Sequence, residues 1–120
     1  PVANILHITA EGFWDLPGTA AFGVAAVAKG SAIRLRHGHF AIVVDARNLP
    51  IQSAAVAETN SLLMPKARLL THGPIAIVAG SMLNKLQNER VFSGDRLRHF
   101  LDHDEAMAWI DSEWMGKRAA

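Results

Sequence analysis

The stretch that decides the fold is Phe40-Ala41-Ile42-Val43-Val44 (FAIVV, residues 40–44), which Asp45 follows directly. A short, unbroken apolar run is typical of a β-strand that is covered on both faces of a parallel sheet. A second run of this kind is Ile75-Ala76-Ile77-Val78-Ala79 (IAIVA, residues 75–79). The two runs predict buried, parallel strands, which need a crossover helix between them.

The segments on either side continue an alternation of strand and helix. Strands are predicted over residues 5–13 and 97–101, and helices over 19–36, 53–64, 80–94 and from 102 onward. In the first of these helices, Ala21, Val24, Ala25 and Ala28 recur at helical spacing. The chain therefore predicts a single α/β domain over residues 1–120, with a mostly parallel sheet of 4–5 strands and about 4 helices.

Composition narrows the classes of function. The chain has 120 residues, a net charge of +1 and no cysteine. Mixed charge argues against a nucleic-acid-binding surface, and the lack of cysteine excludes disulfides and thiolate zinc sites. No continuous apolar stretch reaches the ~18 residues of a membrane span, and no signal peptide is visible. We expect a cytoplasmic protein without a membrane span.

Several segments, taken together with their spacing, match one known family. They are Ala41–Asp45, Ser53 at a helix start, Gly73–Ala79, Val91-Phe92-Ser93-Gly94, and His99–Ala106. In this pattern the chain resembles the STAS domains, the SpoIIAA-like group that includes anti-sigma-factor antagonists. The resemblance implies a regulatory, non-enzymatic domain that binds a protein partner through the loop before Ser53 and the helix after it.

The chain departs from the motif at which that family is phosphorylated. Where the family has Asp-Ser-Ser-Gly, the register set by Asp45 places Ser53-Ala54-Ala55-Val56. Ala54 then occupies the position of the phosphorylated serine, and only a shift of one residue would bring in Ser53. We therefore expect a partner-binding domain without the family's phosphorylation switch. Ala54 and Ala55 are small and apolar, which suits close packing against a partner.

Ligands of open α/β sheets bind beyond the carboxyl ends of the strands. The residues predicted at this edge are Trp14, Asp15, Asp45, Arg47, Gln52, Ser53, Gly80, Ser81 and Met82. The contacts we expect to matter most for a partner or ligand are Trp14, Asp45, Arg47, Ser53, Ala54, Ala55, Ser81 and Met82. A second hypothesis is a small apolar or anionic ligand in a cleft between Trp14, Arg47 and Ser81.

Each of these side chains also has an ordinary structural interpretation. Ser53 and Ser81 can serve as helix caps, or can present a helix N-terminus to an anion. Arg47 can pair with Asp45 or Asp15 instead of contacting a ligand. Trp114 lies ~140° from Trp109 around a helix with ~100° per residue. Trp109 is therefore expected in the core and Trp114 at the surface.

Two further hypotheses concern chemistry. His37 and His39 would share a face of one strand, near His72 at the start of the next, but a metal site would need more ligands. Pro1 could act as a general base if it were a free N-terminal amine, as in tautomerases. No catalytic motif is visible, so we expect no enzyme, no metal and no cofactor. A homodimer fits the composition equally well.

Overall fold

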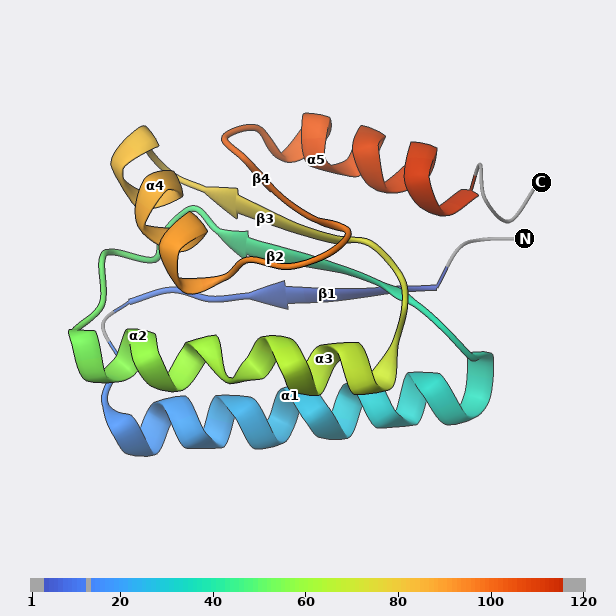
Figure 1. Ribbon diagram of the computed structural model, residues 1–120, viewed down its shortest axis with the longest axis horizontal. Helices are drawn as coiled ribbons and strands as arrows, with labels where there is room; N and C mark the ends of the chain where they lie inside the picture. The colour runs from blue at the N-terminus through green and yellow to red at the C-terminus, as the bar shows by residue number, and fades with distance from the viewer. Residues whose placement is uncertain (1–3, 13, 116–120) are drawn as a thin grey trace.

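The computed structural model describes residues 4–12 and 14–115 of the chain and shows a three-layer α/β domain (Figure 1). Four parallel strands form the sheet: β1 (Ile5–Thr9), β2 (Ala41–Ala46), β3 (Ile75–Ala79) and β4 (Leu97–Phe100). Their order in the sheet is the order in the chain. The predicted α/β class, the parallel sheet and the burial of β2 and β3 are confirmed.

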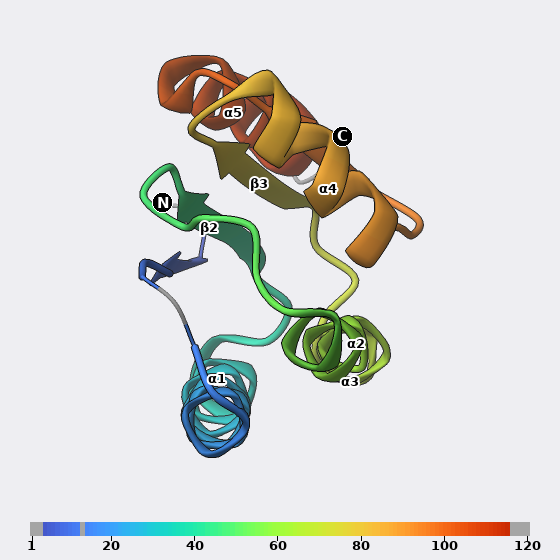
Figure 2. The ribbon, with the colours of Figure 1, turned by 90° about the vertical axis from the view of Figure 1, so that its left-hand side faces the viewer.

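The two faces of the sheet are covered by different helices (Figures 1 and 2). The helices are α1 (Leu16–His37), α2 (Ala54–Ser61), α3 (Leu63–Leu70), α4 (Met82–Val91) and α5 (His103–Ile110). The connections β1–α1–β2 and β2–α2–α3–β3 cross on the same side, as right-handed crossovers between adjacent parallel strands require. The chain after β4 turns to the opposite face (Figure 2). Among the described residues, that face is covered by α5 and by the helical turn over Asp111–Met115 that continues it.

Alternate residues of each strand supply the two cores. The row Leu6, Ile42 and Ile75 joins a cluster with Phe40 on the side of α1 and α3. The neighbouring positions, including Val43 and Val78, form a second cluster with Ala106, Ile110 and Trp114. A strand period of two residues therefore explains why both central strands are apolar throughout.

α1 begins earlier than the sequence predicts. The segment before Thr19 is expected to be a turn, but Asp15 caps a helix there, since its Oδ1 accepts a 2.7 Å hydrogen bond from Gly18 N. Pro17 lies in the first turn, where its missing N–H costs no helical hydrogen bond. The cap and the proline together move the helix start to Leu16.

The apolar spacing noted in α1 marks its outer side. Ala21, Val24, Ala25 and Ala28 are exposed, with Val24 72% accessible. The inner side, which contacts α2, α3 and β1, carries instead Phe22, Ala26, Gly30 and Ile33. By length and composition, α1 could also cross a membrane, contrary to the count of continuous apolar residues. A single helix of this kind is weak evidence for a membrane span, and 11% of its most apolar window is buried in the protein.

Pro65 does not end the helical segment that Ser53 begins. α2 ends at Ser61, Leu62 keeps a helical backbone conformation, and α3 starts at Leu63. Pro65 then occupies the first turn of α3, a position that tolerates proline. Nearly continuous helix therefore runs from Ala54 to Leu70 along α1 (Figure 1).

Trp114 is buried, contrary to the expectation that it lies at the surface. Its exposed fraction is 8%, and it packs in the cluster with Ile110. The reason is that α5 changes to a π-helical turn over Asp111–Met115. Hydrogen bonds from residue i to i+5 rotate position 114 back toward the sheet, which an ideal α-helical wheel does not allow for. Trp109 packs against the same core, as predicted.

Candidate functional site

At the carboxyl edge of the sheet, Asp45 and Arg47 pair with each other. Arg47 Nε and one terminal nitrogen donate to the two carboxylate oxygens, at 2.9 and 2.7 Å. The hydrogen bonds from Arg47 lower the pKa of Asp45 to about 2, so the carboxylate stays ionised at neutral pH. Arg47 and Asp45 therefore neutralise each other within the chain. This agrees with the interpretation that Arg47 pairs with a nearby carboxylate instead of contacting a ligand.

The two edge serines both cap helices. Ser53 Oγ accepts a hydrogen bond from Val56 N at 3.3 Å, and Ser81 Oγ accepts one from Asn84 N at 3.1 Å. Both residues remain exposed, as do Ala54, Ala55 and Met82. These positions are open to a partner, and their conformations are explained by capping alone.

Trp14 belongs to a different environment from Arg47 and Ser81. Its backbone N–H donates to Gln52 Oε1 at 2.8 Å. Its ring packs against Phe22 of α1 in a tilted arrangement, with ring centroids 4.7 Å apart and an angle of 51° between the ring planes. The Gln52 amide in turn donates to Gly12 O at 3.0 Å, so it ties two loops of the edge together. Trp14 lines a cavity inside the protein, whereas neither Arg47 nor Ser81 contributes to that cavity.

Three histidines, His37, His39 and His72, lie at the amino end of the sheet. The rings of His39 and His72 contact each other in a tilted arrangement with centroids 4.6 Å apart, and His72 N donates to His39 Nδ1 at 3.1 Å. His37 ends α1 and is not in a strand, so the predicted sharing of a strand face with His39 is wrong. Within residues 4–12 and 14–115, no three His, Asp or Glu side chains are grouped closely enough to hold a metal. Pro1 lies outside the described residues.

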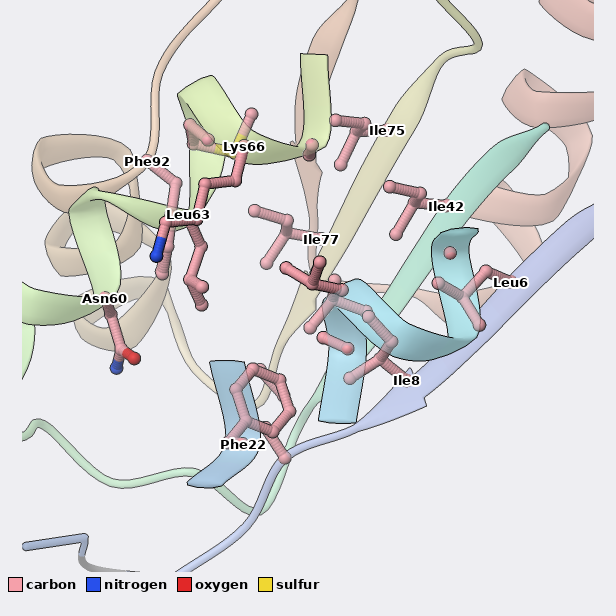
Figure 3. Close-up of a pocket in the computed structure, with 18 of the residues that line it drawn as sticks. Leu6, Ile8, Phe22, Ile42, Asn60, Leu63, Lys66, Ile75, Ile77 and Phe92 are labelled. Atoms are coloured by element: carbon pink, nitrogen blue, oxygen red, sulfur yellow. The ribbon is translucent and has the colours of Figure 1, made fainter. Parts of the chain in front are cut away.

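An apolar cavity lies between the sheet and the helices α1 and α3 (Figure 3). Its volume is ≈ 110 Å³. The sheet contributes three pairs of aliphatic side chains to the lining, from β1, β2 and β3: Leu6, Ile8, Ile42, Val44, Ile75 and Ile77. An apolar cavity of ~150 Å³ is known to bind benzene, so the size suits a small ring.

Small residues on the helices make this space. α1 turns Ala26 and Gly30 toward the sheet, and α3 contributes Ala67. A Cβ added at Gly30 would lie 3.0 Å from Leu70 Cδ1 and 3.3 Å from the Phe40 ring, so the helices already touch at this point. The cavity lies on the Ala26 side of that contact. It remains open because Ala26 and Ala67 carry only methyl groups, where larger side chains would fill the space.

The lining has one enclosed polar group. Asn60 of α2 is 6% exposed, and its Oδ1 has no hydrogen-bond partner in the protein. Besides Asn60, only Lys66 and Asn88 bring polar side chains, and both are less buried. Asn60 also borders a second pocket of ≈ 20 Å³, where Gln52 and Asn84 contribute further amides.

Sequence reasoning did not find this cavity. The only signal was the pair Ala26 and Gly30, four residues apart in α1, which could have indicated a close or incomplete contact on the inner side. Without knowledge of which side faces the sheet, the equally small Ala21, Ala25 and Ala28 give the same signal.

Comparison with known proteins adds no family to these observations. Neither the protein-family models nor the curated proteins contain a match to this chain. The resemblance to STAS domains therefore depends only on the segments quoted under Sequence analysis.

Proposed function

We propose that this protein is a binding domain for a small, mainly apolar ligand, which occupies the cavity between the sheet, α1 and α3. The observation that carries the proposal is the cavity itself, which has a volume of ≈ 110 Å³. It is bordered by the sheet and by the helices on one face of the sheet, and its lining is almost entirely apolar. An apolar ligand that fills this space would remove the apolar lining from water, which favours binding.

The lining favours binding over chemistry. Among the described residues that border the cavity there is no His, Asp, Glu or Ser, and the only charged side chain is that of Lys66. General acid–base or nucleophilic catalysis needs such groups within hydrogen-bond reach of the reacting atoms. Four aromatic side chains in the lining, Trp14, Phe22, Phe40 and Phe92, suit van der Waals contact with a ring.

The first test is binding of benzene. A ligand that binds only the native state stabilises it by about 1.4 kcal/mol at ten times its Kd. We expect benzene to raise the melting temperature by a few degrees, and to shift the NMR signals of methyl groups such as Ile77 and Leu63. Thermal unfolding and NMR titration with benzene measure both effects.

A matched pair of variants locates the site. Ala26→Leu places extra carbons in the cavity, and we expect it to abolish the benzene effect. Ala25→Leu makes the same change on the exposed side of α1, and we expect benzene to bind as it does to wild type. Absence of binding to wild type, or equal binding to both variants, would refute the proposal.

A second candidate function is the protein-interaction role that the STAS resemblance implies. It is favoured by the exposure of Ser53, Ala54 and Ala55 at the start of α2, where no neighbouring element covers them. Ala55→Glu should remove a specific partner from pull-downs and leave the melting temperature unchanged, whereas Ala28→Glu on exposed α1 should not. An identical set of captured proteins for wild type and Ala55→Glu would contradict this candidate.

A further inference from the structure

The buried amide of Asn60 limits what chemistry the ligand can have. The residue lies at the end of the cavity opposite Leu6 and Ile42 (Figure 3). Its Oδ1 is enclosed and lacks a hydrogen-bond partner. An unsatisfied polar group of this kind typically costs ≈ 1–3 kcal/mol, and native proteins seldom leave one without a partner.

The surroundings of Asn60 indicate an uncharged partner. The small pocket that Asn60 also borders is lined by four further amide side chains, and among its described lining residues none is charged. The four amides belong to Gln52, Asn84, Gln87 and Asn88. Its volume of ≈ 20 Å³ is enough for one water molecule or one hydroxyl group. An ionised group placed there would lose its hydration without gaining a counter-charge.

We infer that the ligand is an alcohol: a small apolar body, about as large as a benzene ring, with one uncharged hydroxyl group hydrogen-bonded to Asn60. This inference rests on the proposed function, because it assigns the polar end of the ligand to the same cavity. The body packs against the aliphatic side chains of the sheet, and the hydroxyl donates to Asn60 Oδ1 at the border of the small pocket.

The test compares benzene, phenol and benzoate as probes. Their dissociation constants are measured by NMR titration at neutral pH for wild type, Asn60→Leu and Asn48→Leu. Asn48 is the matched control, because it is exposed and borders neither pocket. Phenol and benzene differ only by the hydroxyl, so the ratio of their dissociation constants isolates its contribution from the binding of the ring. A neutral hydrogen bond contributes about 1 kcal/mol, which is about a fivefold change in affinity.

We expect the preference for phenol over benzene to fall about fivefold in Asn60→Leu and to stay as in wild type in Asn48→Leu. We also expect benzoate to bind more weakly than phenol. Asn60→Leu should fold, since it replaces an amide without a partner by an apolar group of similar size. Asn60→Ala, which is smaller, provides the same comparison if leucine does not fit.

The outcomes separate this inference from the proposed function. Benzene binding with an unchanged phenol preference in Asn60→Leu overturns the inference alone. An equal loss of the preference in Asn48→Leu also overturns it. Tighter binding of benzoate than of phenol overturns it as well, in favour of Lys66 as the anchor. Failure of all three probes to bind wild type overturns the proposed function and the inference together.

Discussion

Thr71 joins the beginnings of two neighbouring strands through a single hydroxyl group. The residue is 1% exposed, and its Oγ1 accepts hydrogen bonds from Phe40 N at 2.8 Å and Gly73 N at 3.1 Å. It also donates to Phe40 O. The backbone of Gly73 also lies close to that of Phe40, and a side chain would not fit there, because a Cβ at Gly73 would lie 1.9 Å from Phe40 O. The hydroxyl therefore satisfies three backbone groups that no water can reach.

Replacement of this hydroxyl tests how much of the stability depends on it. Thr71→Val keeps the shape and leaves two buried N–H groups and one C=O without a partner. At ≈ 1–3 kcal/mol for each unsatisfied group, partly relieved by relaxation, we expect a loss of about 3 kcal/mol in the free energy of unfolding.

Chemical denaturation of Thr71→Val measures this loss. Thr59→Val is the matched control: the Thr59 hydroxyl donates to Ala55 O within an exposed helical turn, so its replacement should cost less than about 0.5 kcal/mol. Equal stabilities of the two variants would show that the Thr71 hydrogen bonds contribute little.

Local features at this scale could be predicted from sequence, and distant ones could not. The sequence indicates Ser53 and Ser81 as possible caps, because the side chain of a capping residue accepts a hydrogen bond from the backbone N–H of the residue three positions later. Thr71 and Phe40 are 31 residues apart, and nothing near either of them specifies the other. Asn60 went unnoticed for the same reason: its burial depends on α1 and α4, not on its neighbours in α2.

At the scale of elements, strand patterns were more informative than helix patterns. The unbroken apolar runs at 40–44 and 75–79 have only one common explanation, a strand covered on both faces, and β2 and β3 confirm it. The sequence of α1 offers no such contrast, because the helix itself carries small apolar residues on nearly all of its sides. Its orientation follows from Phe22 and Ile33, the large side chains that reach the sheet.

The cavity is likewise a property of packed elements. It exists because α1 and α3 meet each other closely at Gly30 while their alanines stop short of the sheet. No single residue type encodes such a space, and a change of one side chain, such as Ala26→Leu, is enough to remove it. The sequence therefore predicts the layers of the molecule but not the cavity between them.

For the whole molecule, two histidines make stability depend on pH. Burial lowers the pKa of His99 below its ordinary 6.5, and loss of hydration together with the nearby Arg34 and His72 lowers that of His39. The folded protein therefore binds fewer protons than the unfolded chain just below pH 6.5. Stability is complete above that pH and decreases as the pH falls through 6.5 toward the lowered values.

Denaturation between pH 7.5 and 5 measures this dependence. We expect the free energy of unfolding of wild type to decrease over the acidic half of that range. His99→Gln should reduce the slope, and the double variant with His39→Gln should reduce it further. A slope that is the same in wild type and the double variant would exclude these two side chains as its source.

Because each strand pairs only with its neighbours in the chain, the protein can assemble in the order in which it is synthesised. One side of the growing sheet gains its helices as the strands appear. On the opposite side, the described residues that cover Val43 and Val78 belong to α5 and the turn after it, so these valines stay uncovered until α5 has left the ribosome. A chain that stops before α5 would present this bare layer to other molecules, which makes premature termination a route to aggregation.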